Sequence, residues 1–160
     1  MDSGDQITIS LRVLLAAALG AFIGIERELR GYPAGVRTMA LVALGSALFT
    51  EISLLTSTED RIAAGIVTGI GFLGAGVIFR EGYTIKGITT AATVWSAAAI
   101  GMAVGRRLYL AAGLGALLIF LLLEARAVVN PLDDFLRRRV PWLIAHEPEE
   151  HAKRNENDRR

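Results

Sequence analysis

The fold class is decided by the stretch at 61–80, R-I-A-A-G-I-V-T-G-I-G-F-L-G-A-G-V-I-F-R. No charged residue lies between Arg61 and Arg80, and apolar and polar positions do not alternate as they would in a half-buried strand. A helix needs about 20 mostly apolar residues to cross the ~30 Å hydrocarbon core of a bilayer. The stretch therefore predicts a membrane-spanning helix.

Four further apolar segments flank this one, at 9–25, 36–55, 88–104 and 108–123, the last extending as far as 129. We predict an all-α membrane protein, a compact bundle of five transmembrane helices with Gly- and Ala-rich packing faces. Gly31, Pro33 and Gly35 break the chain between the first two segments. The link at 105–107 is so short that the last two helices must form a hairpin.

The placement of lysine and arginine predicts the orientation. Thirteen of the 17 basic residues lie around the link between the first two segments, in the link between the third and fourth segments, or in the C-terminal tail. The other four are Arg12, Arg61, Arg106 and Arg107. Basic residues collect on the cytoplasmic side, so we expect the N-terminus outside and the C-terminus inside. We divide the chain into a short polar N-terminus (1–8), a helical domain (9–129), an amphipathic interfacial segment (130–144) and a polar disordered tail (145–160). A plain stop-transfer flank fits 130–144 equally well.

The composition excludes several kinds of site. The net charge is only +1, although 21% of the residues are charged, so no overall field indicates a nucleic-acid partner. Cysteine is absent, and both histidines, His146 and His151, lie in the polar tail. No Gly-rich phosphate loop, Ser/His/Asp set or metal-ligand cluster occurs in the sequence. We therefore predict that the protein is not an enzyme.

Small residues predict how the helices pack, because lipid tails are as apolar as leucine and only close backbone approach favours association. In the third segment, glycines occupy two opposite faces, from which we expect this helix at the centre of the bundle; partial unwinding around a site is the alternative. We expect a homo-oligomer, with a dimer favoured. Replacement of Gly20 or Gly101 by leucine should disrupt association. The predicted packing residues are Gly20, Gly24, Gly65, Gly69, Gly71, Gly74, Gly76, Gly101 and Gly105.

The predicted topology brings one set of polar residues to the inner surface, where four helix ends meet. We name this set the cytoplasmic-mouth cluster: Glu26, Glu28, Arg37, Thr38, Arg80, Glu81, Thr89 and Thr90. Its three carboxylates are candidates for holding a hydrated Mg²⁺, and no other cofactor is predicted. Arg37, near a helix N-terminus, is a candidate for binding an anion. The alternative is mutual pairing of interfacial charges, in which Arg27 and Arg30 act as topology signals.

Deeper polar residues are few. Glu51 lies near the outer end of the second segment, where it can reach the interface. Trp95 lies in the middle of a span, so we predict a buried aromatic whose indole N–H needs a partner inside the bundle. No chain of carboxylates crosses the membrane, as a proton-coupled pump would usually require.

Three motifs resemble those of the MgtC/SapB family of bacterial inner-membrane proteins. They are G-I-E-R-E-L-R-G-Y-P-A-G-V-R-T at 24–38 with A-L-V-A-L-G at 40–45, R-I-A-A-G-I-V-T-G-I-G-F-L-G-A-G-V-I-F-R-E-G at 61–82, and G-I-T-T-A-A-T-V-W-S-A-A-A-I-G-M-A-V-G at 87–105. The resemblance places signature positions at Glu26, Arg27, Glu28, Arg37, Thr38, Arg80, Glu81, Thr90 and Trp95.

The resemblance implies a multi-pass protein without enzymatic activity, involved in adaptation to magnesium limitation. Virulence-associated members are regarded as regulators of other membrane proteins, including the ATP synthase. Two departures separate this chain from them: Thr89 and Ser96 stand where those members often have Asn and Cys, and the tail is too short for their soluble domain. Regulation through other inner-membrane proteins is thus the leading hypothesis; the alternatives are a transporter or channel for magnesium or another small solute, and a structural scaffold.

Overall fold

The computed structural model describes residues 2–56, 59–82 and 84–125. The chain divides into two units, Met1–Leu123 and Glu124–Arg160, and the description concerns the first. The predicted extension of the last helix towards 129, the amphipathic segment at 130–144 and the tail at 145–160 lie outside the described residues.

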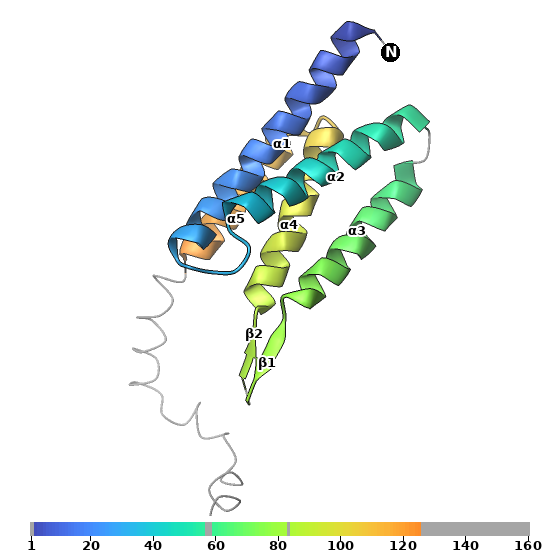
Figure 1. Ribbon diagram of the computed structural model, residues 1–160. Coiled ribbons are helices and arrows are strands. Elements are labelled where there is room, and N and C mark those ends of the chain that lie inside the picture. Colours follow the sequence, from blue (N-terminus) through green and yellow to red (C-terminus); the bar gives the residue numbers. More distant parts are fainter. Residues whose placement is uncertain (1, 57–58, 83, 126–160) are drawn as a thin grey trace, which may run out of the picture. The chain divides into compact units, whose positions relative to one another are not determined.

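The described chain is mostly helical, and all five predicted helices are present (Figure 1). They are α1 (Ser3–Leu29), α2 (Val36–Thr56), α3 (Glu59–Gly76), α4 (Ile88–Gly105) and α5 (Tyr109–Glu124). Among the described residues, α1, α2 and α4 are long and apolar enough to cross a membrane. The apolar parts of α3 and α5 are shorter. The mostly helical class is confirmed, and the number of spans stays a prediction.

Helices α1, α2 and α4 pack against one another and form the core. Glycines permit the close contacts: a Cβ at Gly20 would lie 2.8 Å from the Cβ of Ala43, and a Cβ at Gly101 would lie 2.9 Å from the carbonyl carbon of the same residue. Helix α5 packs on this core through Ala112 and Ala116 and through stacking of Phe22 on Phe120, with ring centroids 4.7 Å apart.

Helix α3 does not occupy the centre, and that prediction is wrong for the single chain. It contacts α2 and α4, yet no described residue lies within 4 Å of a Cβ built at Gly65, Gly69, Gly71 or Gly76. Among the glycines of α3, Gly74 is the one that faces a described neighbour, Ala91 of α4. A small residue permits close approach without specifying a partner. Two glycine-rich faces therefore do not by themselves require two neighbouring helices.

The start of α1 differs from the predicted one, and the turn after α4 agrees with the predicted link. Helix α1 begins at Ser3, not near 9, because Asp2 and Asp5 form a reciprocal capping box that satisfies the first backbone N–H groups. The polar start of the chain is thus part of the helix. The tight link after α4 is present: Arg107 adopts a φ of 66°, and the N–H of Leu108 donates to the carbonyl of Ala103.

The link between α3 and α4 contains a short antiparallel hairpin of β1 (Phe79–Glu81) and β2 (Thr84–Lys86). Gly82, with a φ of 60°, lies in its turn. The hairpin closes directly onto α4, where Gly87 has a φ of 92° and passes against the carbonyl of Val77. The apolar run thus ends in β structure, so the chain is not all-α.

Candidate functional site

The C-terminal turn of α1 carries a buried arginine. Arg27 is 2% exposed, and its Nη2 donates to Oγ1 of Thr90, a buried residue in the first turns of α4. Its guanidinium lies over the ring of Tyr32, 4.0 Å from the centroid. A buried charge needs such partners, and a cation over an aromatic face gains further stabilisation. Arg27 therefore joins α1, α4 and the link that follows α1.

The neighbouring Glu26 is also buried, at 3% exposure. Its Oε1 pairs with Nε of Arg30 one turn later, at 2.8 Å. Its Oε2 is buried and accepts no hydrogen bond within the described part of the chain. A carboxylate held by one arginine and flanked in sequence by another is locally neutralised, which disfavours recruitment of a free cation.

Glu28 has a different role, at the start of α2. Its Oε2 accepts the backbone N–H of Val36 at 2.8 Å, which satisfies a donor that the helix leaves open. Gly35 leaves room for this contact, since a Cβ there would lie 2.5 Å from the same oxygen. Arg37 and Thr38 are exposed in the first turn of α2.

The structure divides the predicted cytoplasmic-mouth cluster into two groups. Glu26, Glu28 and Thr90 gather around the end of α1. On the hairpin, Nε of Arg80 donates to the carbonyl of Gly82 at 2.8 Å, and Glu81 pairs with Lys86. The residues of β1 and β2, together with Gly82 and Thr89, are exposed.

The three carboxylates proposed for magnesium do not fit such a site. Among the described residues, no group of three acidic, histidine or cysteine side chains is arranged to hold a metal ion. Each carboxylate has its own partner: Arg30 for Glu26, a backbone N–H for Glu28 and Lys86 for Glu81. These residues assemble as charge pairs and a helix cap.

Trp95, predicted as a buried aromatic, is 49% exposed. It belongs to the face of α4 formed by Ile88, Ala92, Trp95 and Ala99, all of which are exposed. The opposite face of α4, with Ala97 and Val104, is buried. The residues around Trp95 at helical spacing thus face away from the core, and the indole N–H needs no partner inside the chain.

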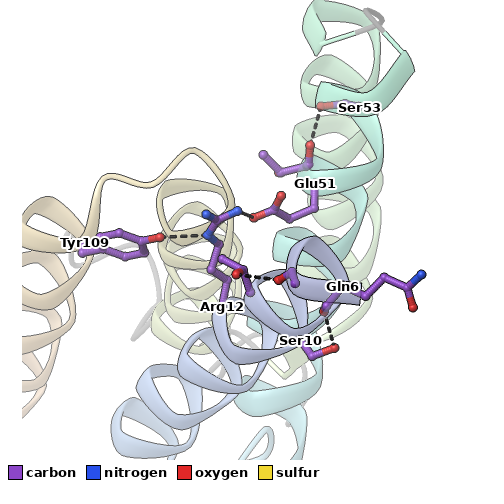
Figure 2. Close-up of polar contacts among 9 residues, drawn as sticks. Gln6, Ser10, Arg12, Glu51, Ser53 and Tyr109 are labelled. Carbon is purple, nitrogen blue, oxygen red and sulfur yellow. Dashed lines mark hydrogen bonds and ion pairs between the residues drawn. The ribbon is translucent and has the colours of Figure 1, made fainter. Parts of the chain in front are cut away.

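A second polar cluster, which sequence reasoning missed, joins three helices. Arg12 lies between Glu51 and Tyr109 (Figure 2): its Nη1 is 3.0 Å from Oε1 of Glu51, and its Nε donates to the Tyr109 hydroxyl at 2.8 Å. The side chains of Arg12 and Glu51 are 14% and 4% exposed. Arg12 and Arg27 are separated by about 22 Å along α1, so the two clusters are distinct.

The sequence contained a signal for this pair. Arg12 and Glu51 interrupt the first two apolar segments at similar distances from the turn that joins them. In an antiparallel helix pair, residues equally far from the turn come to the same level. Opposite charges within two such segments predict an ion pair, because an isolated charge in the apolar region is costly.

Comparison with known proteins gives three informative relatives. Protein MgtC of Salmonella typhimurium is 56% identical over 97 residues, covering 59% of this chain and 42% of that protein. Protein MgtC of Brucella abortus is 45% identical over 136 residues, covering 83% and 56%. A protein of Synechocystis sp. described as uncharacterized is 46% identical over 132 residues, covering 81% and 55%. No solved structure matches the chain.

The chain spans about half the length of the curated relatives it matches. The sequence profile of the MgtC family matches residues 13–132, which include Glu26, Arg27 and Thr90. The match covers most of the chain and agrees with the resemblance of the three motifs. The chain therefore belongs to the MgtC family.

Proposed function

We propose that this chain is a five-span protein of the bacterial inner membrane, with its N-terminus outside, that supports adaptation to magnesium limitation by binding and regulating other membrane proteins. Membership of the MgtC family and three helices of membrane-spanning length and composition support this placement. The role in magnesium limitation is what the resemblance of the motifs implies.

The observation that carries the regulatory role is the distribution of polar groups in the core. Charged residues pair at Arg12 and at the C-terminal turn of α1, and between them the buried positions of the helix are Ala16, Gly20, Ile23 and Gly24. The buried hydroxyls of Thr50 and Thr93 donate to carbonyls of their own helices. A transport route usually needs polar groups along its length. This arrangement favours a protein that acts through its surface.

The outer face of α3 is a suitable surface for a partner helix. Gly71 has nothing within 4 Å of a built Cβ, and Phe72 beside it is 81% exposed. A small residue next to a large apolar one allows another helix to approach closely in the membrane. This surface is the one on which we expect association with other membrane proteins.

The test is growth of a deletion strain across magnesium concentrations, with capture of cross-linked membrane partners by the tagged chain. We expect a growth defect at low magnesium, restored by the wild type and not by Gly71→Leu, which should also lose the captured partner. Gly113→Leu on α5, where a built Cβ also meets nothing within 4 Å, is the matched control. Normal growth of the deletion strain, or partner capture unaffected by Gly71→Leu, would refute the regulatory role.

One observation favours transport as a second candidate: the open acceptor at Oε2 of the buried Glu26. A buried carboxylate with unused acceptor capacity is typical of ion and proton pathways. Purified protein in liposomes should then move magnesium or another small solute, and Glu26→Gln should abolish the flux. Liposomes that show no flux with the wild-type chain would eliminate this candidate and leave the regulatory role untouched.

A further inference from the structure

An apolar groove of about 710 Å³ runs between α2 and α3. It exists because three positions on its walls lack side chains: nothing lies within 4 Å of a Cβ built at Gly45, Gly65 or Gly69. The residues that matter here are Gly45, Ser46 and Phe49 from α2 and Arg61, Gly65 and Gly69 from α3. Among the described residues that line the groove, Arg61 is the one that carries a charge.

The dimensions of the groove match an acyl chain. From Arg61 to Leu73 it follows α3 for about 18 Å, close to the ~15 Å of hydrocarbon in one leaflet. A helix segment of that length, about 10 Å wide, occupies on the order of 1,400 Å³, roughly twice the volume available. A helix would therefore rest on the groove, whereas a single acyl chain can lie inside it.

The charge at one end suits a phospholipid headgroup. Arg61 lies in the first turn of α3, and its guanidinium is suited to contact a phosphate. Glu59 and Asp60 precede it in the sequence, so the formal charge of the stretch 59–61 is not positive. A zwitterionic headgroup that carries an ammonium beside its phosphate suits this balance better than an anionic one.

We propose that the groove between α2 and α3 binds one acyl chain of a phosphatidylethanolamine-type phospholipid, with Arg61 contacting the phosphate. The bound chain covers the glycines that the protein leaves open and seals α3 against α2. Helix α3 is held to the rest of the molecule on one side only, so the lipid becomes part of its packing.

The test is native mass spectrometry of the full chain, purified in detergent and titrated with phosphatidylethanolamine, phosphatidylglycerol or diacylglycerol. We expect one phosphatidylethanolamine per chain, bound more tightly than phosphatidylglycerol. Gly65→Leu and Gly69→Leu should lower this affinity about tenfold or more, since contact with even two methylene groups is lost. Gly71→Leu, on the opposite face of the same helix, should bind as the wild type does.

Arg61→Gln distinguishes the contribution of the headgroup from that of the acyl chain. It should weaken the binding of phosphatidylethanolamine about tenfold and leave the binding of diacylglycerol unchanged. Photo-crosslinking with a diazirine-labelled acyl chain should label peptides from 41–49 and 61–73 in the unaltered protein, independently of any variant's folding. Unchanged lipid binding by Gly65→Leu, tighter binding of phosphatidylglycerol, or labelling elsewhere would overturn the proposal. So would conversion of a dimer to a monomer by Gly65→Leu without loss of lipid, because the groove would then be a helix interface.

Discussion

Gly101→Ala tests whether the close contact between α4 and α2 sets the stability of the core. The new Cβ would lie 2.9 Å from the carbonyl carbon of Ala43 and closer still to its oxygen, whereas ordinary contacts begin at 3.4 Å. The helices must separate by at least about 0.5 Å, because the obstructing atoms belong to the backbone and cannot rotate away. Overpacking of this kind costs about 1–3 kcal/mol, and a rigid neighbour places the cost near the upper end.

The substitution also has a favourable effect, since alanine exceeds glycine in helix propensity by about 1 kcal/mol. The net result is a loss of about 2 kcal/mol in the free energy of unfolding. Gly113→Ala on α5 is the control, because nothing lies within 4 Å of its Cβ. Its free energy of unfolding should rise by up to about 1 kcal/mol, so the free energies of unfolding of the two variants should differ by about 3 kcal/mol.

The assay is reversible unfolding in mixed detergent micelles, followed by circular dichroism at several ratios of protein to detergent. The contact of Gly101 lies within one chain, so the loss should be the same at every ratio. The sequence alone predicted an effect on association, which would change with dilution. If the free energy of unfolding of Gly101→Ala equals that of the wild type, or rises as much as that of Gly113→Ala, the close approach of α4 to α2 is wrong.

Three further predictions use the same unfolding assay. Thr90→Val leaves the buried Arg27 without its hydroxyl partner and should cost about 1–3 kcal/mol; an unchanged stability would contradict the buried contact. Glu51→Leu leaves Arg12 without a countercharge and should cost about 3 kcal/mol, most of it recovered by adding Arg12→Met; a double variant as unstable as the sum of the single ones would argue against the ion pair. Arg107→Gly relieves a left-handed backbone with a φ of 66° and should stabilise by about 1 kcal/mol; destabilisation would mean that the arginine side chain makes a contact of greater value.

The helices could be predicted because each depends on a local run of residues. The long apolar segments predicted all five, and the short link at 105–107 predicted the turn after α4. The start of α1 was misplaced because its first turn is polar: apolar periodicity does not register a helix that begins with a capping box at Asp2 and Asp5. The hairpin after α3 was not predicted, because two strands of three residues each are too short to show the alternation of apolar and polar residues that marks a strand.

The candidate site was predicted in part. Glu26, Glu28 and Thr90 all make contacts around the end of α1, and the structure adds the buried Arg27, which bonds to Thr90. Arg27 looked like a topology signal because an arginine at the end of a span usually reaches water. Its burial depends on Thr90 and Tyr32, which lie 63 and 5 positions later in the sequence, and no local pattern shows that they converge.

Hydropathy and motif spacing by themselves determined the helical class, the positions of the helices and membership of the MgtC family, because these depend on which residues neighbour one another along the chain. The tertiary structure alone decided which helix faces are occupied. Glycines on α1 and α4 meet α2, while those of α3 at 65, 69, 71 and 76 meet nothing within the part of the chain that the structure describes. The physical reason is that a missing side chain makes close packing possible at every such position, and only the three-dimensional arrangement determines where a neighbour is present.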